Sequence, residues 1–271
     1  MASRGHILAF HSQNISGNSY ATNDHVALDD TLKTLDALRM PILRLTQVIK
    51  RLRAKEFWTL PERFVCITFD DGPDYDWKPV THLVHGLQEP MGAILRRHQR
   101  SFLGLSWHKP VATSFVIASP KAREEIAGPA NPDRMSDDWW RVAHRSGIME
   151  IGNHGWNHVH PSVAEMQTSP HLIEAFHGIS SADDADLQIR RAGAYIRQTA
   201  GQDAGKVFAY PYGQVSEFLA NQFFPAQQAI LGAVTTDGRP VLEDCNVWQV
   251  PRYVCGWHWK SNEELGRVLA E

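Results

Sequence analysis

Two neighbouring carboxylates, Asp70 and Asp71, follow an apolar run in the stretch ITFDDGPDYD, which extends from Ile67 to Asp76. Adjacent like charges repel each other, so a buried strand that ends in two of them needs something that keeps both ionised. A divalent cation would do this, because its charge offsets the repulsion between the carboxylates. A plain Asp-Gly turn is the alternative interpretation of this pair.

Two histidines, His154 and His158, have a spacing that suits metal ligands. Residues four apart face the same way if the backbone turns helically, so both imidazoles can bind one ion. One carboxylate with two imidazoles leaves coordination positions open for water, which is typical of a catalytic site. If Asp71 is the carboxylate ligand, Asp70 is free to accept a proton from the attacking water.

These two pairs and one turn each come directly after a predicted strand. The carboxylates follow Phe64–Phe69, the histidines follow Ile148–Ile151, and the turn Pro211–Gly213 follows Val207–Tyr210. In a parallel barrel the carboxyl ends of the strands share one face. We therefore expect three segments that are distant in sequence to meet at a single site.

The remaining elements are predicted from apolar spacing and capping residues. Further strands are predicted at Ile7–Phe10, Val111–Ala118, Ile230–Val234 and Val247–Val250. Helices are predicted from Asp29 or Asp30 through Leu38, from Thr46 through Leu52, from Ser136 through Val142, over Asp183–Ala200, and over Asn262–Leu269 with Ser261 as the cap. Strands separated by helices indicate parallel βα units and an α/β fold. Residues 74–110 and 119–136 resemble insertions or long loops, which often shape the substrate site of a barrel.

Composition excludes several classes of protein. The 271 residues carry 27 basic and 30 acidic side chains, a net charge of −3, so no basic surplus indicates a nucleic-acid partner. Three cysteines without a CxxC pair argue against a disulfide framework or a cysteine zinc site. We found neither an apolar stretch long enough for a membrane span nor a signal peptide, which favours a cytoplasmic protein, although a trimmed signal stays open. The sequence predicts no oligomeric state.

Three motifs resemble those of the polysaccharide deacetylase family, also called the NodB-homology or carbohydrate esterase family 4 domain. TFDDGP at Thr68–Pro73 is similar to the first motif, HGWNH at His154–His158 to the second, and FAYPYG at Phe208–Gly213 to the third. The resemblance covers about residues 60–255, and the opening ILAFH is similar to the lead-in of poly-N-acetylglucosamine deacetylases. The resemblance implies a distorted (β/α)7 barrel, NodB-like, with residues 1–271 as one catalytic domain.

The resemblance also implies roles for particular residues. Asp70 matches the general base, and Asp71, His154 and His158 match the metal ligands. The metal is usually Zn²⁺, with Co²⁺ or Ni²⁺ as alternatives. The backbone N–H of Tyr212 matches a donor to the oxyanion. The implied substrate is an acylated saccharide, and the implied reaction is removal of its acyl group, in the first place N-acetyl.

The chain departs from the family pattern at the residues that handle protons. Ala209 stands where many members have an arginine that orients the base, and Arg252 in VPRY is the candidate replacement. The usual late motif that donates a general acid is not evident, so His258 in GWHW and His160 are candidates for the acid. His160 is also a rival to His158 as a ligand, because Val-His-Pro follows His158 in place of Pro.

Substrate contacts and competing functions complete the expectations. His11, at the end of the first strand, is expected to line the substrate site with Trp156, Pro211 and Tyr212. An unclear acid leaves room for a sugar O-acetyl esterase, because an alcohol leaves more easily than an amine. A sugar deformylase and a non-catalytic carbohydrate-binding relative are also compatible with the sequence.

Overall fold

A seven-stranded parallel sheet forms the centre of the computed structural model, which describes residues 3–101, 109–128 and 132–271. The strand order is β8-β7-β6-β5-β2-β1-β9, and every pairing in this sheet is parallel. The strands are β1 (Arg4–Phe10), β2 (Arg63–Phe69), β5 (Ala112–Val116), β6 (Met149–Asn153), β7 (Val207–Ala209), β8 (Gly232–Val234) and β9 (Tyr253–Val254). The sheet curls into a distorted (β/α)7 barrel, as expected from the sequence.

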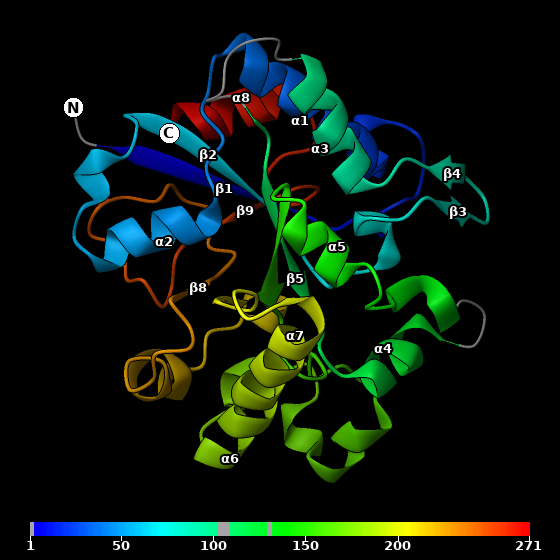
Figure 1. Cartoon of the computed structure of the whole chain (residues 1–271), viewed down its shortest axis with the longest axis vertical. Helices are drawn as coiled ribbons and strands as arrows, with labels where there is room; N and C mark the ends of the chain where they lie inside the picture. Colours follow the sequence, from blue (N-terminus) through cyan, green and yellow to red (C-terminus); the bar gives the residue numbers. More distant parts are fainter. Residues whose placement is uncertain (1–2, 102–108, 129–131) are drawn as a thin grey trace.

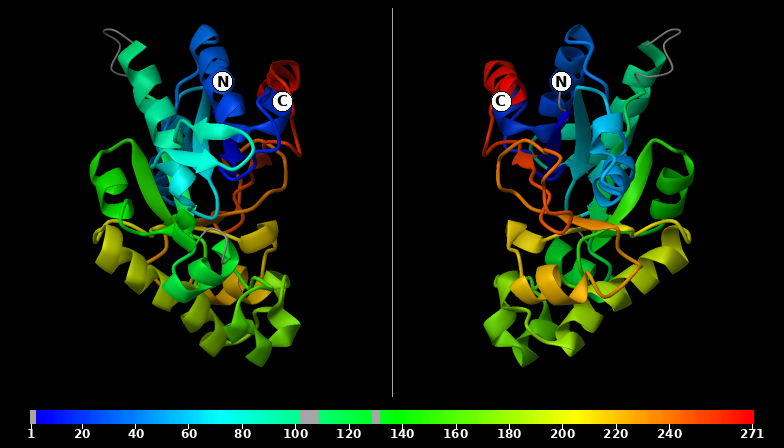
Figure 2. Two further views of the ribbon diagram at one scale, coloured as in Figure 1. Left: turned by 90° about the vertical axis from the view of Figure 1, so that its right-hand side faces the viewer. Right: turned by 90° about the vertical axis from the view of Figure 1, so that its left-hand side faces the viewer.

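Helices cover both ends of the molecule, and the strands run between them (Figure 1). Figure 2 shows α1, α3 and α8 grouped at one end, and α4, α6 and α7 at the other. The helices are α1 (Asp24–Ala37), α2 (Leu45–Arg53), α3 (Met91–Ser101), α4 (Pro120–Ala127), α5 (Trp140–Arg145), α6 (Ala182–Ala185), α7 (Ala192–Ala200) and α8 (Asn262–Ala270). None of the described helices combines the length and the apolar character needed to cross a bilayer.

The central strands are buried on both faces. All but the first residue of β1 and of β2 are buried, and so is every residue of β5. The continuous apolar runs in the sequence follow from this burial, because a parallel strand covered on both sides has no solvent face for polar residues. The strand predicted at Val247–Val250 does not form: Val250 makes an isolated bridge to Val234, and the next strand of the sheet, β9, begins at Tyr253.

Three predicted helix starts are wrong. In each case the residue expected to cap the helix either lies inside it or bonds to a different group. Helix α1 begins at Asp24, not at Asp29 or Asp30, since the Asn23 side chain accepts a hydrogen bond from the His25 N–H. Thr46 lies inside α2, and its hydroxyl bonds to Glu150 at 2.5 Å. The Ser136 hydroxyl donates to Asp74 at 2.7 Å and does not cap α5.

The predicted helix at Asp183–Ala200 is confirmed, with one irregularity. The helical segment runs through α6 and α7, and the Ser181 side chain caps its first turn by accepting from the Asp184 N–H. Between them, residues Asp186–Arg191 form a π-helical turn. The cap of α8 by Ser261 is confirmed as well, since its hydroxyl accepts a hydrogen bond from the Glu264 N–H.

The two predicted insertions carry several short elements. The first holds the 3-10 turn η3 (Asp74–Asp76), the hairpin of β3 (Val80–His82) with β4 (Gly86–Gln88), and helix α3. The second holds α4 and the 3-10 turn η4 (Pro132–Met135). Both contribute side chains to a cavity at the site described next.

Candidate active site

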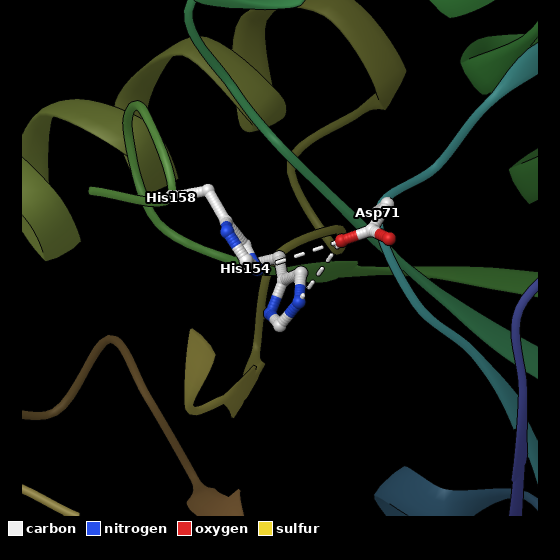
Figure 3. Close-up of side chains that lie close together, drawn as sticks. All are labelled: Asp71, His154 and His158. Carbon is white, nitrogen blue, oxygen red and sulfur yellow. Dashed lines mark ion pairs between the residues drawn. The ribbon is translucent and has the colours of Figure 1, made fainter. Parts of the chain in front are cut away.

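Asp71, His154 and His158 converge at the carboxyl ends of β2 and β6 (Figure 3). The Nε2 atoms of His154 and His158 each lie 3.5 Å from Oδ1 of Asp71. The spacing argument assumed a helical turn between the two histidines. The chain does not form one. Left-handed conformations at Gly155 (φ 88°) and His158 (φ 58°) fold the loop back instead and bring the rings together, with centroids 4.7 Å apart.

The tautomer of His154 favours a cation at this point. Its Nδ1 lies 2.8 Å from the carbonyl oxygen of Ala209, which can only accept, so Nδ1 carries the proton. In the neutral ring, Nε2 then presents a lone pair to the Asp71 carboxylate. Burial opposes a positive charge here, but the Asp71 and Asp70 carboxylates outweigh it and raise the pKa of His154, so a positive charge between the ring and Asp71, from a proton or a bound cation, is favoured.

The donor set fits a divalent cation in number, type and separation. Ligands about 2.1 Å from a tetrahedral ion are about 3.3–3.5 Å apart, which agrees with the observed 3.5 Å separations. Burial lowers the pKa of His158 to about 3 and keeps its ring neutral, as a ligand must be. The three residues can therefore hold the ion and leave further positions open.

Asp70 has a different partner from its neighbour. Its two carboxylate oxygens accept hydrogen bonds of 2.7 Å from the two terminal nitrogens of Arg252, which is fully buried. Burial alone would raise the pKa of Asp70, but the charge and hydrogen bonds of Arg252 outweigh it and hold the pKa below its usual value. Arg252 is itself fixed by Thr68 and by the carbonyl of Thr235, so the plane of the carboxylate is set from both sides.

Two cavities meet at the cluster. One, of about 290 Å³, is lined by both carboxylates and both histidines together with His11, Tyr212 and Trp257, among others. The other, of about 390 Å³, extends toward η4 and the β3–β4 hairpin. Asp71, His158 and Tyr212 line both, so the candidate metal centre lies where the cavities join.

His11 and Tyr212 lie at the cavities, as expected. The His11 backbone N–H donates to Asp24 at 2.7 Å, and its buried Nδ1 has no hydrogen-bond partner among the described residues. Tyr212 adopts φ 58° in the tight Pro-Tyr-Gly turn, and its ring contacts that of His158, with centroids 4.5 Å apart. Pro211 is buried beneath this turn and lines neither cavity.

Two predicted site residues lie elsewhere. Trp156 is only 7% exposed and packs in the core under the Arg191 guanidinium, 3.9 Å from the ring centre, so it lines neither cavity. His258 stacks on Trp257, and its Nδ1 accepts a hydrogen bond from the Val254 N–H at 2.7 Å, so it too is absent from both cavity walls. Trp156 is thus part of the core, and the His258 ring is held within a local turn.

His160 lines the larger cavity but is not part of the ligand cluster. Its Nδ1 accepts a hydrogen bond from the Ser162 N–H at 3.1 Å. Among the described residues it is therefore His158, and not His160, that faces Asp71 with its Nε2 atom.

Three residues near the site were not predicted. Gln13 donates to the second oxygen of Asp71, and Trp257, 67% exposed, lines the smaller cavity. Asp76 is fully buried and accepts hydrogen bonds from Ser12 at 2.5 Å and from Ser114 at 2.6 Å, which tie η3 to the sheet. Asp76 is the last residue of the stretch Ile67–Asp76 that contains both catalytic candidates, but no sequence pattern predicts its hydrogen-bond partners.

Solved structures of low sequence identity share the fold. The Streptococcus pyogenes deacetylase PplD in complex with acetate is 16% identical, with a TM-score of 0.66 over 99% of each chain. BC0361, a polysaccharide deacetylase from Bacillus cereus, is 14% identical, with a TM-score of 0.65 over 99% of this chain and 69% of that one. The putative polysaccharide deacetylase BA0330 from Bacillus anthracis is 14% identical, with a TM-score of 0.61 over 93% of this chain.

The family assignment rests on the match to a protein-family model and not on these distant structures. The chain spans 65% of the BA0330 chain, and no curated protein matches it. The model named Polysaccharide deacetylase matches residues 58–223, which is more than half of the chain and contains all three candidate ligands. The strand ends bring together the residues of the three motifs that suggested this resemblance, and the chain belongs to the polysaccharide deacetylase family.

Proposed function

We propose that this protein is a metal-dependent hydrolase that removes an N-acetyl group from a sugar in an oligo- or polysaccharide or its precursor. The observation that carries the proposal is the convergence of Asp71, His154 and His158 beside a second carboxylate that takes no part in the cluster. The acetate named in the PplD structure, a product of deacetylation, agrees with this choice of acyl group.

Asp71, His154 and His158 would hold the cation, with Zn²⁺ the first choice because two imidazoles and one carboxylate suit it. A bound cation would make water more acidic and polarise the acyl carbonyl. The carbonyl of Ala209 orients His154, and Gln13 donates to the oxygen of Asp71 that the histidines do not face. These contacts outside the ligand set hold the ligands in the required rotamers.

Asp70 accepts the proton of the attacking water. Its low pKa keeps it ionised at neutral pH, and Arg252 fixes the carboxylate in one orientation. Arg252 is a positioning residue, and it supplies the charge that the arginine at the position of Ala209 supplies in many members of the family. The Tyr212 N–H makes no hydrogen bond in the described part of the chain, so it is available to the oxyanion of the tetrahedral intermediate.

His11, in place of His258, protonates the leaving amine. Of the histidines that line the smaller cavity, His11 is the one outside the ligand cluster, and it shares that wall with Asp70. An amine cannot leave as an anion, so it needs a proton donor. His160 lines the other cavity, and its Nδ1 is already occupied by a backbone N–H.

Mass spectrometry of acylated saccharides tests the proposal. N-acetyl, O-acetyl and N-formyl derivatives of the same oligosaccharide are incubated with the protein, with and without a chelator. We expect chelator-sensitive loss of acetyl from nitrogen. Faster release from oxygen would make the protein an esterase, and loss of formyl alone a deformylase. If nothing is released from any derivative with added Zn²⁺, Co²⁺ or Ni²⁺, the proposal is wrong and carbohydrate binding without catalysis replaces it.

A further inference from the structure

The larger cavity has walls that the three motifs do not supply. Its volume is about 390 Å³, and it opens beside Asp71, His158 and Tyr212. The rest of the wall comes mainly from the two insertions. Ile117, Ile126 and Met135 form its apolar part, and Tyr75, His82, Arg134 and His160 its polar part.

Arg134 brings a positive charge to this wall, without an acidic partner among the side chains that the structure describes. Its side chain is half-buried, and no carboxylate oxygen among the described residues lies within 4.0 Å of it. Its contacts are a hydrogen bond of 3.4 Å to the carbonyl of Thr81 and the face of Tyr75, 5.7 Å from the ring centre. A partly desolvated guanidinium with only these contacts retains donors for a ligand.

Tyr75 adds a second unused donor. The side chain is only 3% exposed, yet its hydroxyl has no hydrogen-bond partner in the described residues. A buried hydroxyl without a partner is costly, and the cost disappears when a ligand accepts its proton. Because the Arg134 guanidinium lies over the ring of the same tyrosine, one ligand group can use both.

The tautomers of two histidines make them donors as well. The Nδ1 of His82 accepts hydrogen bonds from the N–H groups of Val84 and His85, and the Nδ1 of His160 accepts one from Ser162. In each neutral ring the proton must therefore be on Nε2. Among the described side chains that line this cavity, the one carboxylate is that of Asp71, which already faces two imidazoles and Gln13.

We propose that this cavity binds an anionic substituent, a carboxylate or a phosphate, on the acylated saccharide. Such a group has only acceptors, and the wall offers donors from Arg134, Tyr75, His82 and His160. Arginine binds both kinds of anion through paired hydrogen bonds. The inference rests on the proposed function, because it places the substituent next to the sugar whose acyl group is removed. The substrate is accordingly an acidic saccharide.

Three disaccharides test this in binding and in turnover. Each has an N-acetylglucosamine unit joined to glucose, to glucuronic acid, or to glucose 6-phosphate, so only the neighbour's charge changes. Calorimetric titration of the Zn²⁺-loaded Asp70→Asn protein gives Kd values without turnover. We expect at least one acidic disaccharide to bind about tenfold or more tightly than the neutral one, with the advantage shrinking as salt rises. The preferred one shows whether carboxylate or phosphate is the ligand.

Variants of the wall separate this proposal from a general charge effect. Arg134→Gln should erase the preference and leave the Kd of the neutral disaccharide within about twofold, while Arg134→Lys should keep part of it. Tyr75→Phe should reduce it a few-fold. Arg267→Gln, on the distant helix α8, changes the net charge equally and should have no effect. Thermal unfolding of each variant controls for folding.

The outcomes distinguish this inference from the proposed function. Equal Kd values for all three disaccharides, or a preference that survives Arg134→Gln, would overturn the anion site even if all three are deacetylated. A preference that Arg134→Gln abolishes, without release of acetate from any disaccharide by the unsubstituted protein, would keep the anion site and remove the deacetylase.

Discussion

Asp70 and Asp71 are adjacent in the chain, yet their carboxylates meet opposite environments. Asp71 faces two imidazole nitrogens at 3.5 Å, and Asp70 faces a buried guanidinium at 2.7 Å. A left-handed conformation at Asp71 (φ 70°) turns the chain between them. The separate partners keep both acids ionised and allow them separate tasks, which resolves the repulsion that the sequence presents.

Asp70→Asn tests the division of tasks. The amide retains the shape of the carboxylate but cannot accept the proton, so we expect metal binding to remain and turnover to fall by about 10²–10⁴-fold. Elemental analysis of the protein and acetate release measure the two properties. Asp71→Ala is the matched control, because it should lose the metal as well. An Asp70→Asn protein with full activity would rule out the assignment of the base.

His11→Asn tests the proton donor through its dependence on the leaving group. We expect amide hydrolysis to fall by about 10²-fold or more, because the amine needs a proton. Hydrolysis of an aryl acetate, whose phenolate leaves unaided, should change little. His258→Asn serves as the comparison and should leave the ratio of the two rates unchanged. Equal losses on both substrates in His11→Asn would argue against its role as the acid.

At the level of elements, the turn after β2 controls the position of both carboxylates. Gly72 has φ 68°, and a Cβ there would lie 2.5 Å from Cγ1 and 2.9 Å from Cα of Val116 on β5. The conformation disfavours a side chain, and the space beside Val116 does not admit one. The Asp-Gly pair in the sequence can therefore be a turn signal and part of the proposed catalytic site at the same time, and the two interpretations do not compete.

Gly72→Ala should destabilise the protein and weaken metal binding together. The left-handed backbone costs an alanine about 1–2 kcal/mol, and the contact with Val116 adds to this. Gly86→Ala is the control, since its φ of 73° is similar but a Cβ would meet nothing within 4 Å. Urea unfolding and Zn²⁺ titration measure both effects. Similar losses for the two variants would show that crowding against Val116 is unimportant.

The sequence predicted most strands but not the contacts that hold the loops. The apolar runs before Asp70 and before His154 form strands β2 and β6, as predicted. Such runs identify these strands because most of their residues are buried. By contrast, Gln188, in the π-helical turn, accepts hydrogen bonds from the Trp156 and Asn157 N–H groups and so supports the histidine loop. Such long-range polar contacts depend on tertiary packing, and no local periodicity announces them.

The sequence predicted which residues come together where a motif specifies them, but not which side chains are exposed at the cavities. The cluster of Asp71 with two histidines follows from residue type and spacing. Trp156 was expected at the substrate but is buried, whereas Trp257 is exposed at the cavity. One sequence cannot distinguish these indoles, because burial depends on which elements pack against each.

At the level of the whole molecule, His6 should make the fold sensitive to acid. This ring in β1 is fully buried, neither nitrogen has a partner among the described residues, and burial lowers its pKa to about 4. The ordinary pKa of histidine is 6.5. Below pH 6.5, His6 therefore binds a proton in the unfolded chain but not in the folded chain. The contribution of His6 to stability is complete above pH 6.5 and is lost as the pH falls toward 4, by about 3 kcal/mol in all.

His6→Phe should remove this component and flatten the pH dependence of stability between pH 6.5 and 4. Urea unfolding of both proteins at several pH values measures it, and the difference between them cancels other titrating groups. A difference that does not change across this range would show that His6 does not titrate as proposed.

Removal of the metal should also lower the stability of the folded protein. The candidate ligands join loops that follow β2 and β6, strands that lie on either side of β5 in the sheet. An ion that binds only the folded state adds about 2–4 kcal/mol at 100–1,000 times its Kd. Thermal unfolding with and without a chelator should therefore show a lower Tm in the chelated protein. An unchanged Tm would argue against a tightly bound ion.

The residues matched by the family model, 58–223, include the candidate ion ligands and Asp70, but neither His11 nor Arg252. Those two come from β1 and from the segment before β9, which are neighbours at one edge of the sheet. The candidate ion ligands and the proposed base thus lie within the matched range, whereas the residue that orients the base and the proposed proton donor come from the flanks. An excised 58–223 fragment would keep Asp70 but lose the flanking strands and, with them, the arginine that orients this base and the proposed proton donor His11.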